Sequence, residues 1–253
     1  KNLTMKGKFS SAKAYTGAFT GNVRGKLINC VNEVELTLTS GSGASAFGQA
    51  YENAVFEKCV NKAHITGAST FVAGLVTDAL ANVTFTDCGN EGVIESKYSG
   101  SVATSRQGIA GLVATAISPK MTRCYNKGTI KLAKPEAMMG VAGILGYAKS
   151  NTTNKDSLVM DGCYNTVDLT AGYMVSGMVA DIDGSATISN FMTFRNCYNT
   201  GNLTVNATTS KTNGCVAGIS VMYTRGTKFE NCYNTGTIRN DNPKQAYAAG
   251  IVA

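Results

Sequence analysis

Apolar and polar positions recur along this chain in one pattern, which is centred on a cysteine followed two residues later by an asparagine. An apolar residue stands three residues before each cysteine, and an isoleucine or leucine stands six residues after it. The alternation has a period of two and lacks helical spacing, so it predicts strands and turns. The seven copies are LINCVNEVEL, FEKCVNKAHI, FTDCGNEGVI, MTRCYNKGTI, MDGCYNTVDL, FRNCYNTGNL and FENCYNTGTI.

These copies define two sets of equivalent residues, the cysteines and the asparagines. Successive members of each set are 29, 29, 36, 39, 34 and 35 residues apart, which gives the repeat length. The cysteines are Cys30, Cys59, Cys88, Cys124, Cys163, Cys197 and Cys232. The asparagines are Asn32, Asn61, Asn90, Asn126, Asn165, Asn199 and Asn234. Between the copies lies a second motif of small residues, which reads VAGLV, IAGLV, VAGIL, VSGMV, VAGIS and AAGIV.

A single repeat of this kind cannot bury its own apolar face, whereas coils stacked on one another can. We therefore predict an all-β fold, a single-stranded parallel β-helix of about eight coils of 29–41 residues with three short strands each. The unequal coil lengths favour a right-handed helix. We expect residues 1–253 to form one continuous solenoid domain of a longer protein, with incomplete repeats at both ends. The opening NLTM resembles the NLTV that follows Cys197.

The alternation also assigns the two sides of each strand. With the isoleucine or leucine inward, the cysteine and asparagine point inward or into a corner. We expect the cysteines to form a soft apolar stack and the asparagines a ladder of side-chain amides that satisfies the turns. A glycine two residues after the asparagine is expected to supply the unusual dihedral angles of that corner. This glycine is present as Gly92, Gly128, Gly201 and Gly236.

In the second motif we expect alanine and leucine to face inward, so that Val72, Gly74 and Val76 face outward. Repeated on six coils, these positions would form an apolar strip. Loops of the same chain are the favoured cover for this strip, and a second molecule is the alternative.

Composition narrows the function classes. Hydrophobic residues make up 43% of the chain, which excludes a disordered protein. The net charge of +7 is concentrated near the N-terminus, where residues 1–32 hold six basic and no acidic residues. Aromatic residues do not interleave with this cluster, so we expect a solvated face and no nucleic-acid partner. No run of about 18 apolar residues appears, so we expect no membrane insertion. No signal peptide is visible either.

The AGLV-like segments at 73–76, 110–113, 142–145 and 176–179, together with the CYNTG turns, resemble the GLUG-type repeat proteins. The resemblance covers nearly the whole chain. It implies a β-helical repeat region of a large secreted or surface protein of gut and mucosal bacteria. In such proteins the repeat region is usually a stalk, attached in some members to IgA-cleaving peptidases and in others to adhesin-like proteins. The resemblance therefore implies an extracellular or cell-surface location and says little about activity.

The candidate chemistry is sparse. Regular spacing favours one free buried thiol per coil, with Cys215 as an extra, over one or two disulfides or a metal site. There is one histidine, His64, and no Cys-x-x-Cys pair, so we expect no metal, no cofactor and no Ser-His-Asp arrangement. Asp181 and Asp183 in VADIDG are weak catalytic candidates, because two carboxylates on one strand face could cleave a polysaccharide. Their nearest prospective partners are Asp161 and Asp168.

A set of tyrosines directly follows four successive cysteines and is expected to point outward. Stacked and exposed, these rings could bind sugar rings or a partner protein, or could simply stabilise the solenoid. They are Tyr125, Tyr164, Tyr198 and Tyr233.

The sequence thus favours a non-catalytic structural or adhesive module of a bacterial surface protein, a stalk or fibre segment. Its expected partners are other segments or copies of the same protein, or host or microbial glycans and proteins. The alternative is a β-helix that binds or cleaves carbohydrate.

Overall fold

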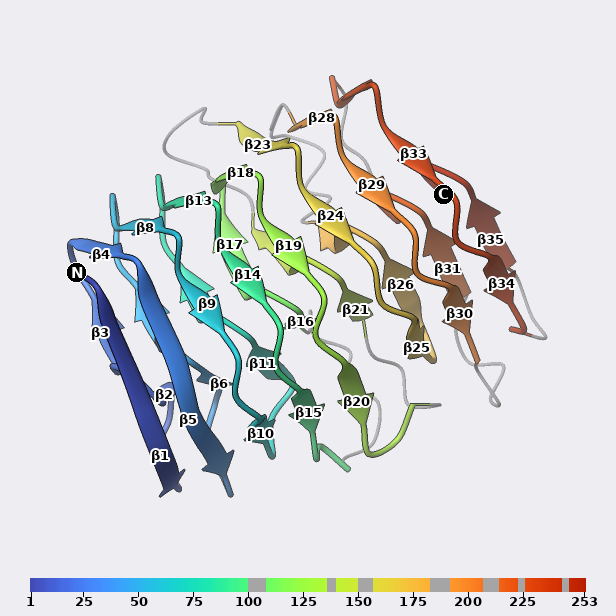
Figure 1. Cartoon of the computed structure of the whole chain (residues 1–253). Coiled ribbons are helices and arrows are strands. Elements are labelled where there is room, and N and C mark those ends of the chain that lie inside the picture. Colours follow the sequence, from blue (N-terminus) through green and yellow to red (C-terminus); the bar gives the residue numbers. More distant parts are fainter. Residues whose placement is uncertain are drawn as a thin grey trace.

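The computed structural model describes residues 1–99, 108–135, 140–149, 157–182, 192–206, 214–222, 226–242 and 246–253. In these ranges the chain forms short parallel strands joined by turns, and it winds through successive coils that stack from β1 to β35 (Figure 1). The all-β parallel solenoid predicted from the repeat is therefore confirmed. Within the same ranges no helix is long and apolar enough to cross a membrane.

Strands of the second motif form an eight-stranded sheet, which we call the VAG sheet. It contains β2 (Thr16–Gly17), β6 (Ala44–Ser45), β11 (Phe71–Ala73), β16 (Gly108–Ala110), β21 (Gly140–Ala142), β26 (Met174–Ser176), β31 (Gly214–Ala217) and β35 (Ala246–Ala249). After a bend, the chain enters the six-stranded side sheet, which contains β3 (Asn22–Val23), β7 (Gln49–Ala50), β12 (Val76–Ala79), β17 (Val113–Ile117), β22 (Leu145–Lys149) and β27 (Val179–Ile182).

The strands before the cysteines form a seven-stranded sheet, which we call the pre-cysteine sheet. It contains β4 (Lys26–Ile28), β8 (Val55–Glu57), β13 (Thr84–Thr86), β18 (Lys120–Thr122), β23 (Leu158–Asp161), β28 (Met192–Arg195) and β32 (Lys228–Glu230).

The remaining strands carry the asparagines and the isoleucine or leucine positions. Long strands β1 (Leu3–Ser11) and β5 (Cys30–Leu38) span both positions in the first coils. The asparagine strands are then β9 (Val60–Asn61), β14 (Gly89–Asn90), β19 (Tyr125–Asn126), β24 (Tyr164–Asn165), β29 (Tyr198–Asn199) and β33 (Tyr233–Asn234). The strands after them are β10 (Ile65–Gly67), β15 (Ile94–Ser96), β20 (Ile130–Leu132), β25 (Leu169–Ala171), β30 (Leu203–Val205) and β34 (Ile238–Asn240).

Each typical coil thus contains five short strands where the sequence pattern predicted three. The difference arises in two places. The second motif bends at its glycine, so that β11 and β12 are separate strands. The segment with the asparagine, which was predicted to be a turn, contains a two-residue strand such as β19. The register between coils pairs like with like: Asn61 lies opposite Asn90, Asn90 opposite Asn126, and Tyr164 opposite Tyr198.

The asparagines form a continuous buried ladder along the stack. From Asn32 to Asn199, each side-chain Nδ2 donates to the Oδ1 of the asparagine in the next coil, over distances of 2.7 to 2.9 Å. Most of these amides also donate to the carbonyl oxygen two residues on, as Asn199 does to Gly201 at 2.7 Å. A buried amide is costly unless it is bonded, so the ladder satisfies both the side chains and the turns.

The corner with unusual dihedral angles lies one residue before each cysteine, not at the glycines after the asparagine. There the backbone has φ between 50° and 66°, at Asn29, Lys58, Asp87, Arg123, Gly162, Asn196 and Asn231. Gly92, Gly128, Gly201 and Gly236 are absent from the residues with positive φ, which corrects the sequence-based expectation. Those glycines are required for space, since a Cβ on Gly92 would collide with the carbonyl oxygen of Ala63 in the preceding turn.

The glycine of the second motif packs against the asparagine ladder across the interior of the coil. A Cβ added to Gly143 would lie 2.6 Å from the Cβ of Asn165, and one added to Gly74 would lie 2.7 Å from Oδ1 of Asn90. The two motifs therefore recur together, because the asparagine side chains fit only against a strand whose glycine has no side chain.

The predicted outward strip of Val72, Gly74 and Val76 is wrong. Val72 packs against Leu36, Ile65 and Ile94 in one core cluster, and Val76 belongs to the main core. The bend at Gly74 breaks the strict alternation on which the prediction depended. Because these positions face the core and are buried, self-assembly through such a strip is contradicted as well.

The main core contains the cysteines together with the apolar residues three positions before them. Phe56 and Phe85 stack with ring centroids 4.9 Å apart, and Phe194 and Phe229 stack at 5.1 Å.

The N-terminal strand has a different register from the one that its sequence suggested. Nine consecutive pairs join β1 to β5, and they place Leu3 opposite Cys30 and Phe9 opposite Leu36. NLTM therefore occupies the Cys-x-Asn position of its coil, not the position of NLTV.

Candidate functional site

On the side sheet, one polar residue from each strand occupies the same place on its rung. The register pairs Gln49 with Asp78, Asp78 with Thr115, Thr115 with Tyr147, and Tyr147 with Asp181. Polar side chains from segments more than 100 residues apart in sequence therefore line up in one row.

Asp78 is the central acidic residue of this row, and only 7% of its surface is exposed. Its Oδ1 accepts hydrogen bonds from Lys149 Nζ at 2.6 Å and from Thr115 Oγ1 at 2.5 Å, and its Oδ2 accepts one from Gln49 Nε2 at 3.2 Å. Lys149 reaches past one whole coil to make this contact, since it lies in β22 and Asp78 in β12. A buried carboxylate is tolerated only with such partners, and here the lysine balances its charge.

A cavity of about 170 Å³ lies beside this ion pair. Three aromatic rings contribute to its walls, and two threonines and a lysine supply polar groups. The lining residues are Tyr15, Phe71, Thr77, Thr115, Tyr147 and Lys149. Mostly apolar walls with a few convergent polar groups are typical of small-molecule sites.

Sequence reasoning did not single out Asp78. A signal was nonetheless present, because Asp78 stands four residues after Gly74 and Asp181 stands four residues after Gly177. Aligning the two copies of the second motif would have placed both carboxylates in one row. The contribution of Lys149 had no such signal, since it depends on the reach of a long side chain across a coil.

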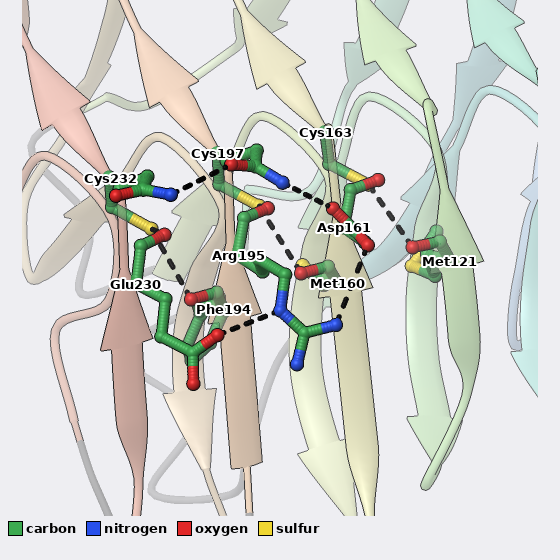
Figure 2. Close-up of polar contacts among 11 residues, drawn as sticks. Met121, Met160, Asp161, Cys163, Phe194, Arg195, Cys197, Glu230 and Cys232 are labelled. Atoms are coloured by element: carbon green, nitrogen blue, oxygen red, sulfur yellow. Dashed lines mark hydrogen bonds and ion pairs between the residues drawn. The ribbon is translucent and has the colours of Figure 1, made fainter.

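Of the two carboxylates predicted as weak catalytic candidates, Asp181 lies in β27 of the side sheet, and Asp183 lies outside the described residues. Three rungs separate Asp181 from Asp78, about 14 Å at the usual strand spacing, whereas glycoside hydrolysis needs carboxylates about 5–9.5 Å apart. Asp161 lies in the pre-cysteine sheet and accepts a hydrogen bond from Asn196 at 3.0 Å (Figure 2). Asp168 accepts one from the backbone N–H of Asn202 at 2.7 Å.

The tyrosines stack in one column, ring on ring. The centroids of Tyr125 and Tyr164 are 5.6 Å apart, those of Tyr164 and Tyr198 4.8 Å, and those of Tyr198 and Tyr233 5.1 Å, with interplanar angles of 14° or less. The faces of the inner rings are therefore covered by their neighbours. Tyr233 ends this column and is 49% exposed.

The cysteines are all free, and those from Cys30 to Cys197 are buried. Several thiols point toward the carbonyl oxygen of the preceding coil, as Cys163 does to Met121 at 3.5 Å and Cys197 to Met160 at 3.5 Å (Figure 2). Burial raises the pKa of the Cys124 thiol, so it stays protonated and unreactive. In the part of the chain that the structure describes, no group of three or more histidine, cysteine or acidic side chains could hold a metal ion.

His64 lies at the surface and contacts Glu95, with 2.9 Å between Nε2 and Oε2. Other charged side chains pair between successive coils. Arg195 bonds Glu230 at 2.8 Å and lies 3.7 Å from Asp161, so that one guanidinium joins three coils (Figure 2).

Comparison with known proteins adds no relative. No family model matches the chain, and neither a curated protein nor a solved structure matches it.

Proposed function

We propose that this chain is a non-catalytic structural repeat module, a stalk or fibre segment of an extracellular or surface protein of a bacterium. The asparagine ladder carries the proposal. Its six amide-to-amide bonds join all seven asparagines, and each bond connects one coil to the next. Such a network adds resistance to separation of the coils along the axis.

Most ion pairs among the described residues support the same role, because they too join one coil to another. Lys6 bonds Glu33 at 2.8 Å, and Arg123 bonds Asp87 at 2.6 Å. Ion pairs at the surface contribute little individually, but they fix which coil lies on which. Acidic side chains that are engaged in this way are poorly placed to act as catalytic acids or bases.

The resemblance of the repeats to GLUG-type proteins supports a bacterial surface location. Buried thiols fit that location as well, because a thiol without solvent access does not oxidise readily in an oxidising compartment. Adhesion to host or microbial molecules remains part of the proposal for the protein as a whole.

Stretching single molecules between their ends tests the structural role. We expect coils to detach one at a time, each releasing about 10–14 nm of chain, because a coil of 29 to 39 residues extends by about 3.5 Å per residue. An Asn165→Ala variant should lower the force at its own coil. The matched control is Asn22→Ala, which changes an exposed asparagine with an ordinary backbone conformation and should leave the force unchanged.

A parallel assay addresses catalysis. The chain is incubated with a panel of plant, microbial and mucosal polysaccharides, and new reducing ends are measured. Unfolding of the whole chain in one step at low force, or the release of sugar fragments, would contradict a purely structural module.

A further inference from the structure

We propose that the cavity beside Asp78 and Lys149 is a binding site for one ring of a neutral saccharide. This inference does not depend on the stalk function, because a structural module with or without a sugar site would have the same ladder.

The walls of the cavity suit the apolar faces of a sugar ring. Tyr15, Phe71 and Tyr147 come from three different strands or turns and line one space. A pyranose ring presents C–H groups on its faces, and these pack on aromatic rings. The turn that carries Tyr15 is held in place, since Thr16 Oγ1 donates to the carbonyl oxygen of Lys13 at 2.9 Å. The backbone that carries the ring is therefore fixed, and 42% of the surface of Tyr15 is exposed.

The polar groups of the cavity suit hydroxyl groups. Lys149 has three N–H donors, and its contact with Asp78 uses one of them. Thr77 Oγ1 donates to the carbonyl oxygen of Gly48 at 2.9 Å, so its oxygen can still accept a hydrogen bond. The hydroxyl of Thr115 is likewise oriented by its bond to Asp78. Donors and acceptors thus lie around one space, which matches neighbouring hydroxyls on a sugar.

Charge decides between a neutral and an anionic ligand. Among the described residues, Lys149 is the cation that lines the cavity, and Asp78 lies 2.6 Å from its Nζ and neutralises it. A carboxylate or phosphate ligand would gain one contact with the ammonium and would be repelled by the carboxylate behind it. The site therefore favours an uncharged ligand.

Size limits the ligand to one ring. The volume of about 170 Å³ is below the range of roughly 300–1,000 Å³ that is typical of sites for drug-sized molecules. We expect the site to bind a terminal or branching sugar of a glycan rather than several consecutive units.

Binding is tested with a glycan array of neutral and acidic saccharides, followed by titration calorimetry with the best neutral ligand. Tyr15→Ala removes one aromatic wall and should weaken binding about tenfold without changing the melting temperature. The matched control is Tyr233→Ala, which removes a tyrosine of similar exposure from the stacked column. It should leave the affinity unchanged.

The outcomes separate the possibilities. Selective binding of neutral sugars that Tyr15→Ala weakens and Tyr233→Ala does not supports the site. Absence of any sugar binding, binding of acidic sugars alone, or binding that depends on Tyr233 and not on Tyr15 would overturn it. The stretching experiment gives the same result in each case, so failure of the sugar site and failure of the stalk function are distinguishable.

Discussion

The substitution Asn126→Asp replaces one buried amide of the asparagine ladder with a carboxyl group of nearly the same shape. Asn126 is fully buried. Its Oδ1 accepts from Asn90 Nδ2 at 2.9 Å, and its Nδ2 donates to Asn165 Oδ1 at 2.9 Å. A carboxylate of the same shape keeps the first bond and replaces the second with two oxygen atoms facing each other.

The cost follows from what the fold loses. One hydrogen bond contributes about 0.5–1.5 kcal/mol, and its loss leaves the Oδ1 of Asn165 without that donor. A buried charge without an ionic partner adds several kcal/mol. We expect the variant to lose about 3–5 kcal/mol of unfolding free energy at neutral pH.

The penalty should depend on pH in a defined direction. Burial and the facing oxygen favour the protonated acid, so the fold raises the pKa of the new carboxyl above its unfolded value of about 3.9. Below about pH 3.9 the carboxyl group is protonated in both the folded and the unfolded chain, and in the folded chain it can donate to Asn165. The free energy of unfolding is then reduced only slightly. The penalty grows as the pH rises toward the folded pKa, and it is complete above it.

Urea unfolding at pH 4 and pH 7 measures the effect. The matched control is Asn231→Asp, in an exposed chain of asparagines where Nδ2 lies 3.3 Å from Asn196 Oδ1. It should change the unfolding free energy by less than about 0.5 kcal/mol at either pH. Equal effects of the two variants, or a penalty at Asn126 that does not vary with pH, would refute the reasoning.

Three further predictions concern other columns of the solenoid. Gly143→Ala should lower the free energy of unfolding, measured in urea, by about 1–3 kcal/mol, because the new Cβ overlaps a backbone carbonyl of the next coil. The control Gly25→Ala has no atom within 4 Å of its new Cβ and should be nearly neutral. Arg123→Ala removes the ion pair with Asp87 and should lower the free energy of unfolding by at most about 1 kcal/mol in urea unfolding, and by less in high salt. Its hydrogen bond lowers the pKa of Asp87, so in the unmodified chain this contribution should be present above about pH 3.9 and disappear as the pH falls through the folded pKa. A thiol reagent should label at most two of the eight cysteines in the native protein, the partly exposed ones, and all eight in denaturant; labelling of a third native thiol would contradict the buried column.

The columns of the solenoid could be predicted from sequence because they depend on offsets alone. Residues at a constant distance from each cysteine must lie over one another once coils stack, and the paired register of Asn61 with Asn90 reflects this directly. No knowledge of side-chain direction was needed for that step.

Side-chain direction was predicted less well, because alternation fails at a bend. One strand ends at Ala73, and the chain bends at Gly74 before the next strand begins at Val76. Residues on both sides of the bend then face the core, which a strict period of two cannot represent. The role of Gly92 was misassigned for a related reason: the sequence shows that a side chain is missing there, but not whether dihedral angle or space requires its absence.

Aligning the second motif would place Asp78, Thr115 and Tyr147 in one row. The cavity beside them could not be predicted, because it also depends on Lys149 and on the turn with Tyr15. Lys149 and Asp78 are 71 residues apart, and the turn with Tyr15 precedes both. Nothing in the local sequence of any of the three indicates the other two.

The direction of the asparagine ladder has a consequence for how the chain reaches this state. Each amide-to-amide bond of the ladder runs from an Nδ2 donor to an Oδ1 acceptor in the next coil toward the C-terminus. During synthesis, a folded coil therefore has a free N–H donor for the asparagine of the coil that is made next. Each new coil can then add to the end of the stack through the same donor-to-acceptor bond, from the first coil to the last.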